Sequence, residues 1–159
     1  MDTKLMEISM FLTTLFTGFY AGTGFFVIMG GNPAIVKMSS QTFAEYWRHT
    51  DFYMAARMKI FGPLLFLTLL STVLLHIKSW HSADFWFLST ALLILIADMV
   101  LIFSTNHPLN KLMHSWDLSD LPDNVEEIKY RVVNAFWLRS SFMIGSFVCV
   151  LLALIIRRR

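Results

Sequence analysis

Residues 85 to 103 of the chain read FWFLSTALLILIADMVLIF. This stretch is apolar over the ~20 residues that a helix needs to cross the hydrocarbon core of a bilayer, with a single acid, Asp98, inside it. An ionisable side chain at the centre of a membrane helix costs roughly 3 kcal/mol, so Asp98 needs an ion-pair partner, a proton or a water-filled pocket. The stretch therefore predicts a membrane span that carries a polar site.

Three further apolar runs are long enough to cross a bilayer. They cover residues 8–29, 60–77 and 132–156, and with residues 85–103 they predict four spans in a single domain, residues 1–159. The composition agrees, because only 15% of the residues are charged, against about 25% in soluble domains. We expect an all-α fold, an integral membrane four-helix bundle.

The sequence before the second span predicts one more helix. Residues 42–57 are too polar to lie in lipid on all sides, so we expect an additional polar, interfacial helix that continues into span two. Thr42 and Glu45 have the spacing of a capping box at its start, and Pro63 allows a kink farther along.

Glycine and proline predict where two other helices end. The sequence Gly30-Gly31-Asn32-Pro33 is expected to end the first helix, because Pro disfavours the helical conformation of its predecessor. Pro108 is expected to end the third in the same way. A short surface segment, about residues 111–121, should then precede span four.

Charge and cysteine content limit the partners. The chain has 13 Lys and Arg against 11 Asp and Glu, and this small, dispersed excess argues against nucleic-acid binding. The single Cys149 excludes an intrachain disulfide. The lipid bilayer is the expected environment, and Gly18-x-x-x-Gly22 in span one allows close helix packing, within the bundle or in a homo-oligomer.

The even number of spans places both termini on the same side of the membrane. The sequence Arg157-Arg158-Arg159 near a helix end favours a cytoplasmic location for that side. The two long polar connections carry more Lys and Arg in total and favour the opposite orientation.

Two buried charges are expected to meet. Asp98 precedes Asn106 by eight residues, about 12 Å along one helix, and Arg139 follows Arg131 by the same number. An acid and an arginine at similar depth are natural partners, so we predict an ion pair between Asp98 and Arg139, with Arg57 as the other candidate. Such a pair can also do no more than fix helix register.

Histidines offer a second kind of site. His49, His107 and His114 share the polar face with several carboxylates, and three imidazoles can bind copper, iron or zinc. Their spacing matches no compact ligand motif, so the sequence predicts no cofactor, with copper, iron or haem as the alternative. His76 and His81 lie at the opposite face and are expected at the interface.

The element Asn106-x-Pro108-x-Asn110 at the end of a third span, Trp116 a few residues later, and a fourth helix that opens with spaced arginines resemble the anthrone oxygenase-like family of small four-span membrane proteins. The resemblance extends over nearly the whole chain in length and span order, but its specificity rests chiefly on the Asn-x-Pro-x-Asn element. His107 and His114 are not part of that pattern.

The resemblance implies oxidation of a flat phenolic or quinone-like substrate by molecular oxygen without an evident bound cofactor. A base must take a proton next to a conjugated ketone, and hydrogen-bond donors must hold the resulting oxyanion. Asp98, His107 and His114 are the candidate bases. The candidate catalytic residues are Asp98, Asn106, His107, Asn110 and Arg139.

Other residues at the same face are candidates for binding the hydrophobic aromatic substrate, with tryptophans expected to sandwich its rings. They are Asn32, Tyr46, Trp47, Arg57, His114, Trp116, Arg131, Asn134 and Trp137. Tyr46 and Trp47 also suit the aromatic belt at the level of the lipid headgroups. The alternative function is a non-catalytic bundle that binds a lipid or quinone, or a small subunit of a larger membrane complex.

Overall fold

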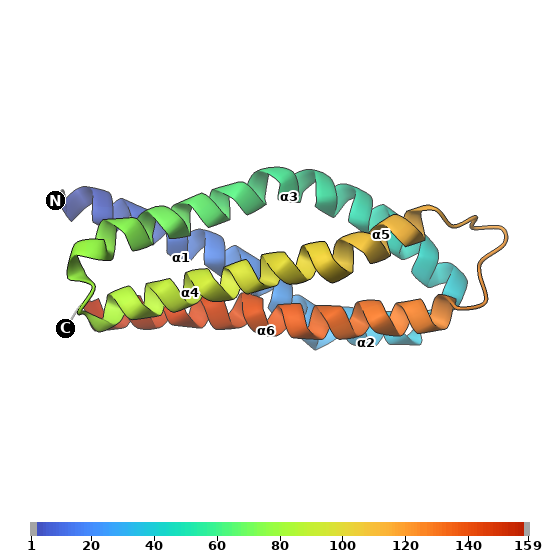
Figure 1. Cartoon of the computed structure of the whole chain (residues 1–159). Coiled ribbons are helices and arrows are strands. Elements are labelled where there is room, and N and C mark those ends of the chain that lie inside the picture. Colours follow the sequence, from blue (N-terminus) through green and yellow to red (C-terminus); the bar gives the residue numbers. More distant parts are fainter. Residues whose placement is uncertain (1–2, 158–159) are drawn as a thin grey trace.

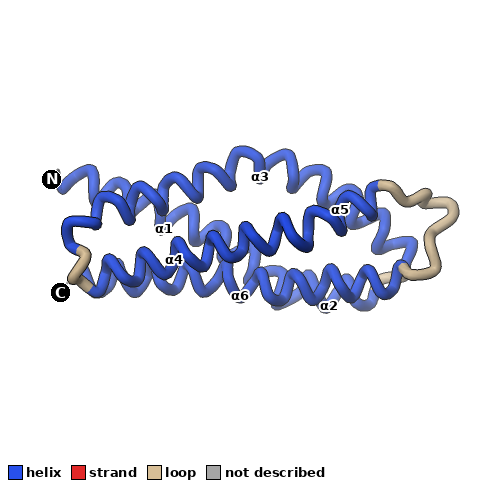
Figure 2. Tube along the Cα trace, in the orientation of Figure 1, coloured by secondary structure: helices blue, strands red, loops and turns tan. Residues whose placement is uncertain are grey.

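Four long helices lie side by side in the computed structural model, which describes residues 3–157. They are α1 (Thr3–Phe26), α3 (Ser40–His76), α4 (Ala83–Leu101) and α6 (Val125–Arg157) (Figure 1). The described part of the chain contains no strand (Figure 2). The predicted all-α four-helix bundle is confirmed.

Short elements extend two of the long helices and join two others. A π-helical turn, η1 (Val27–Gly31), and α2 (Asn32–Lys37) continue α1, and a second π-helical turn, η3 (Ile102–Asn106), and α5 (His107–His114) continue α4. The short 3-10 turn η2 (Ile77–Ser79) joins α3 to α4.

All four helical segments are long and apolar enough to cross a membrane. α3 has 37 residues and α6 has 33, which correspond to roughly 55 and 50 Å at the rise of an α-helix. A hydrocarbon core of about 30 Å cannot contain that length. The bundle therefore extends beyond the bilayer, as expected for a helix that continues from the interface into span two.

The two ends of the bundle differ. α1 begins and α6 ends at one end, which we call the termini end (Figure 1). The other end, which we call the head, contains α2, the first half of α3, α5 and the start of α6. A loop, residues 115–124, closes the head, and the backbone N–H of Ser119 bonded to Asp117 lowers the pKa of that carboxyl.

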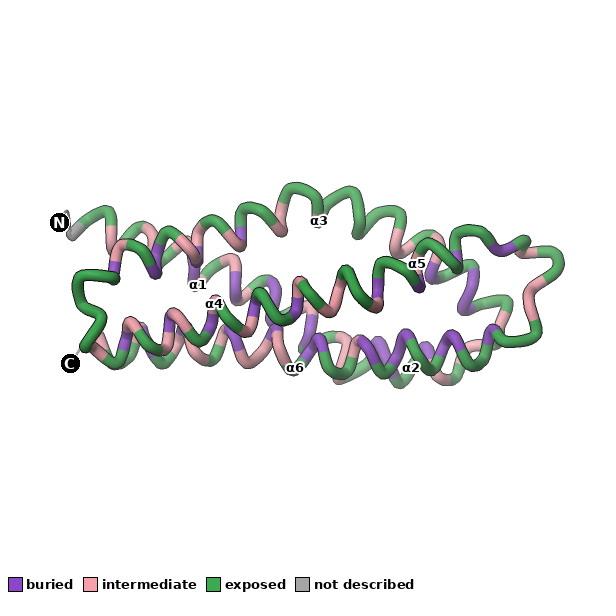
Figure 3. Tube along the Cα trace, in the orientation of Figure 1, coloured by how far each residue is buried: buried purple, intermediate pink, exposed green. Residues whose placement is uncertain are grey.

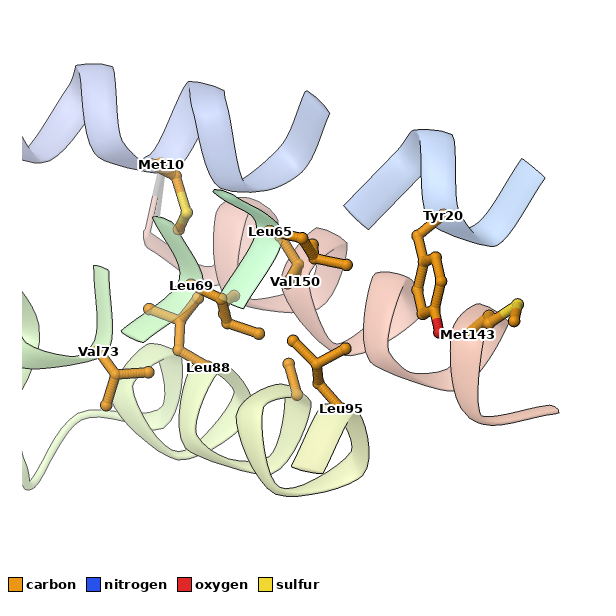
Figure 4. Packing of buried hydrophobic residues seen from close by; sticks show 11 residues of the cluster. Met10, Tyr20, Leu65, Leu69, Val73, Leu88, Leu95, Met143 and Val150 are labelled. Atoms are coloured by element: carbon orange, nitrogen blue, oxygen red, sulfur yellow. The ribbon is translucent and has the colours of Figure 1, made fainter. Parts of the chain in front are cut away.

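Each half of the bundle has its own apolar core. In the spanning half, leucines and small residues of α3, α4 and α6 pack with Met10 and Tyr20 of α1 (Figure 4). In the head, Phe43 and Trp47 of α3 pack with residues of α5 and α6. The other residues of the spanning half are mostly apolar and are exposed or only partly buried (Figure 3), as is expected of a surface in contact with lipid.

The prediction that glycine and proline end the first and third helices is wrong. The backbone passes through η1 into α2 and through η3 into α5 without leaving helical geometry. Pro33 and Pro108 each occupy the first turn of the helix that follows, where a missing N–H is tolerated. The wider π turn supplies the local adjustment that a proline in a continuing helix requires.

The predicted capping box is also displaced. Ser39 is the N-cap of α3, and its Oγ accepts a hydrogen bond from the backbone N–H of Thr42 at 3.2 Å. Glu45 instead accepts from Gln41 Nε2 one turn away. Ser39, three residues before the predicted start, is the better cap, because its extended backbone lets the hydroxyl reach forward to the N–H groups of the first turn.

Glycines do pack α1 against α6, but the pair is not the predicted one. A Cβ on Gly18 would lie 3.3 Å from the ring of Phe147, and one on Gly24 would lie 3.1 Å from Met143 Cβ. A Cβ on Gly22 would meet nothing within 4 Å. The close approach therefore uses Gly18 and Gly24.

Candidate functional site

A buried ionic cluster lies in the spanning half, near its boundary with the head. Arg139 Nε donates to Asp98 Oδ1 at 3.0 Å, and Arg139 Nη2 donates to the Tyr20 hydroxyl at 3.2 Å. The hydroxyl of Tyr20 in turn donates to Asp98 Oδ2. The predicted pair of Asp98 with Arg139 is confirmed, whereas Arg57 is exposed and bonds the backbone oxygen of Tyr53 on its own helix.

The cluster neutralises charge at membrane depth. Asp98 is 1% exposed and Arg139 is 9% exposed, so each depends on the other for compensation of its lost hydration. Phe136 lies one turn before Arg139, and its ring centre is 5.0 Å from the guanidinium carbon. Nη1 of Arg139 has no hydrogen-bond partner among residues 3–157, which leaves a donor available to another molecule.

Asn106 is the most unusual polar residue of the interior. It is 4% exposed, yet neither Oδ1 nor Nδ2 has a hydrogen-bond partner in the described part of the chain. A buried amide without partners costs about 1–3 kcal/mol. Asn106 is the last residue of the π turn η3, and π turns inside α-helices occur often at functional sites.

A second polar cluster connects α3 and α5 in the head. Trp47 Nε1 donates to Asn110 Oδ1 at 3.0 Å, and Asn110 Nδ2 donates to Asp51 Oδ1. The other oxygen of Asp51 lies 2.8 Å from His114 Nε2. Asn106, Asn110 and His114 follow one another at four-residue spacing, so the buried amide continues a polar stripe that begins at the exposed imidazole.

Aromatic rings lie between the two clusters. Phe136 packs edge-on against Trp47 at a centroid distance of 5.4 Å and also contacts the guanidinium of Arg139. Trp47 is thus hydrogen-bonded to the head cluster on one side and separated from the ionic cluster by one phenyl ring. The two clusters are therefore neighbours in one interior region.

Several predicted site residues are elsewhere. Asn32 is buried, but its amide is used, because Nδ2 donates to the Val133 backbone oxygen at 3.0 Å. Trp116 packs in the head core and accepts a bond from Arg48 through its backbone oxygen. The structure leaves six predicted residues exposed on the outside of the helices: Tyr46, Arg57, His107, Arg131, Asn134 and Trp137.

The alternative metal site is not assembled. His49 and His107 are exposed, and His114 is bonded to Asp51. Over residues 3–157, no three His, Cys, Asp or Glu side chains are grouped so that they could hold a metal ion.

Sequence reasoning missed three contributors. Tyr20 completes the ionic cluster, Phe136 separates it from the head, and Asp51 accepts from both Asn110 and His114. Tyr20 had a signal, because a hydroxyl in the middle of a span must find a partner inside the bundle. His76 was expected at the interface, but it is 1% exposed and lies inside the termini end.

Comparison with known proteins gives no relative. No family model matches the chain, no curated protein matches its sequence and no solved structure matches its fold. The resemblance to the anthrone oxygenase-like family therefore stays an expectation from the sequence.

Proposed function

We propose that the protein is a membrane-embedded oxidoreductase of the monooxygenase type that acts on a hydrophobic aromatic molecule with a ring carbonyl, such as an anthrone or a quinone-like compound. The observation that supports it most directly is the buried, unpaired amide of Asn106. A ligand carbonyl or hydroxyl would satisfy that amide, and Arg139 Nη1 is a second donor in the bundle interior, at the level of Asp98 about two helical turns away.

The chemistry needs no external reductant. A ring CH2 beside a conjugated ketone loses a proton to give an enolate, and the enolate gives its electrons to O2. When the new C–O bond forms and the O–O bond breaks, one oxygen atom becomes the carbonyl and the other leaves as water. Asn106 would stabilise the enolate oxyanion, as donors fixed before the charge develops do, and Arg139 would bind a second oxygen of the substrate.

We assign Asp98 the role of holding Arg139 in position. Both of its carboxylate oxygens are bonded, one to Arg139 and one to Tyr20, so proton abstraction by Asp98 would require that it release a cation. His114 is the imidazole connected to the site through Asp51 and Asn110. It is therefore our candidate for exchanging the proton with water.

A non-catalytic role is the second candidate, and a different observation favours it. An open apolar groove between α3 and α4 is lined by Phe66, Ile96, Met99, Val100, Phe103 and Ser104. It faces the side where lipid would lie and suits an acyl or isoprenoid chain. A bundle that only binds a lipid or quinone, alone or as a small subunit of a membrane complex, would use this groove without turnover.

Oxygen uptake separates the two. Purified protein in nanodiscs, supplied with anthrone, should consume oxygen, and Asn106→Ala should lower the rate by about tenfold or more, as loss of one oxyanion donor does. Asn124→Ala, at an exposed position of the head loop, is the matched control. Equal rates of oxygen uptake in wild type and Asn106→Ala would contradict the catalytic role and favour the binding role.

Metal analysis and a visible spectrum of the same active sample test the alternative of copper, iron or haem.

We also propose that the termini end is cytoplasmic. Arg157, Arg158 and Arg159 stand together directly at the end of the last span, whereas the Lys and Arg residues of the head, although more numerous, are interleaved with acidic residues. The cytoplasmic side of a membrane protein is enriched in Lys and Arg. Labelling of single cysteines at Ser79 and Ser119, in a Cys149→Ser background, would test this orientation.

A further inference from the structure

The open groove between α3 and α4 runs from the spanning half toward the head. Its walls are Phe66 of α3 and a stripe of α4 and η3 that extends from Ile96 to Ser104. The groove has a volume of about 720 Å³, which is within the range of ligand sites in proteins. Every lining side chain except that of Ser104 is apolar. Ser104 follows Ile96 by eight residues, about 12 Å along the helix, so the groove suits part of a hydrocarbon chain that lies parallel to the helices.

Two lysines indicate the depth of this groove in the bilayer. Lys78 lies in the turn η2 at the termini end, and Lys59 precedes it by nineteen residues, roughly 28 Å along a helix. This distance is close to the thickness of a hydrocarbon core, about 30 Å, so the two ammonium groups are placed at its two surfaces. Lys59 precedes Phe66 by seven residues, nearly two full turns, and therefore lies on the same side of α3. The head end of the groove is thus at a membrane surface.

Basic side chains lie at that end of the groove. Lys59 is exposed on α3, and His107 and Lys111 are exposed on α5. His107 follows the groove residue Phe103 by four residues, and Lys111 follows His107 by four, so they continue the stripe of the helix that forms the groove. Neither lysine forms an ion pair within residues 3–157. The apolar groove therefore ends in positive charge that the described side chains do not neutralise.

The nearest acidic residues along these helices already have partners. Asp98 is paired with Arg139, and the two oxygens of Asp51 are bonded to Asn110 and His114. An anion at the membrane surface can bind the basic side chains without displacing a carboxylate of the protein. A lipid with a negatively charged headgroup supplies such an anion together with a hydrocarbon chain, and it matches both parts of the groove.

We propose that the groove binds one anionic phospholipid. Its phosphate lies beside Lys59, His107 and Lys111, and one acyl chain lies along the apolar walls between α3 and α4. Basic pockets between membrane helices bind acidic lipid headgroups in the same way. The basic side chains select the headgroup and the groove holds the chain. The proposal does not depend on the oxidoreductase activity, because the lipid is bound and is not consumed.

Native mass spectrometry of the full chain tests the headgroup. The protein is released from detergent that contains equal amounts of dioleoyl phosphatidylglycerol and dioleoyl phosphatidylcholine, so any preference comes from the headgroup alone. We expect one phosphatidylglycerol per chain, retained about tenfold or more over phosphatidylcholine. Lys59→Gln should reduce that preference about fivefold, as loss of one lysine near an anionic lipid does. Lys78→Gln, at an exposed lysine of the other membrane surface, should leave the preference unchanged.

Two tryptophan variants of α4 test the acyl chain. Val100→Trp fills the groove and should lower the retention of phosphatidylglycerol. Leu93→Trp, two turns away on the same face and outside the groove, should not. Val100 and Leu93 are 62% and 66% exposed, so neither change disturbs the core.

Three results would overturn the proposal: equal retention of the two lipids by the wild type, an unchanged preference in Lys59→Gln, or unchanged retention in Val100→Trp. The measurements use neither oxygen nor an aromatic substrate. Their outcome is therefore separate from that of the oxygen-uptake experiment, and either proposal can fail without the other.

Discussion

Asn32 and Asn106 stand at matching places in two helices, and only Asn32 uses its amide. Each lies where a π-helical turn passes into a short helix with proline in its first turn. Asn32 Nδ2 donates to Val133 at 3.0 Å, whereas both amide atoms of Asn106 lack partners within residues 3–157. The two residues have the same side chain and similar burial, so comparing them shows how a hydrogen bond to a buried amide affects stability.

Asn106→Leu should stabilise the empty protein or leave it unchanged, because an apolar side chain of similar size removes an unpaired polar group. Asn32→Leu should cost about 1–2 kcal/mol, because it removes a hydrogen bond and crowds the turn. Thermal unfolding in detergent measures both. A clear destabilisation by Asn106→Leu, equal to that of Asn32→Leu, would mean that Asn106 has a structural partner after all.

The ion pair of Asp98 with Arg139 gives a sharper test by double-mutant cycle. Asp98→Asn or Arg139→Met alone should each destabilise the bundle by about 3–5 kcal/mol, because the remaining charge is buried without compensation. The double variant should cost less than the sum of the two, and the difference is the coupling energy. Additive losses would show that the two side chains act independently.

The four spans and this ion pair could both be predicted from the sequence, because both are required by burial in an apolar environment. Lipid demands long apolar helices, and a buried acid demands a cation at its own depth. Asp98 and Arg139 could be matched by counting residues along two antiparallel helices. Neither step needed a relative.

The sequence did not predict which side chains near Asn106 and Pro108 point into the bundle. Asn106 and His107 are adjacent, but successive residues of a helix point about 100° apart, so Asn106 is buried and His107 is exposed. The sequence predicted that Pro108 ends the third helix, so the direction of the side chains beyond it, which depends on the continuing helix α5, could not be predicted. Tyr20 was missed for a different reason, because its role exists only through contacts with two other helices.

Tyr20→Phe should show how much the hydroxyl contributes to the ionic cluster. It removes one bond to Asp98 and one from Arg139 while it keeps the ring in the apolar core. Hydrogen bonds to charged groups contribute about 1.5–3 kcal/mol each, so a loss of about 2 kcal/mol or more in unfolding free energy is expected. Tyr130→Phe, at a half-exposed tyrosine of α6, should change little. Equal stability of both variants would contradict the role of Tyr20.

Ser39→Ala tests the corrected start of α3. The N-cap hydroxyl accepts from the Thr42 backbone N–H, and loss of such a cap costs about 1 kcal/mol. Glu45→Gln should have almost no effect, because Glu45 bonds only the exposed Gln41. The melting temperatures of the two variants decide between the caps. A capping box at Thr42 and Glu45 would make Glu45→Gln the more destabilising of the two.

The packing of α1 on α6 leads to a last prediction, in which two glycines two residues apart should respond in opposite ways. A methyl group on Gly24 would lie 3.1 Å from Met143 Cβ and 3.2 Å from the Ser140 backbone oxygen, neither of which can rotate away. Gly24→Ala should therefore push the helices apart and cost about 1–3 kcal/mol, as overpacking of a tight interface does. Gly22 faces open space, so Gly22→Ala should gain up to about 1 kcal/mol from helix propensity alone. Because Arg139 of α6 donates to the hydroxyl of Tyr20 across this same contact, Gly24→Ala should also weaken the ionic cluster, and addition of Tyr20→Phe should then cost less than it does in the wild type. An unchanged melting temperature in Gly24→Ala, or a loss in Gly22→Ala, would show that α1 meets α6 through another face.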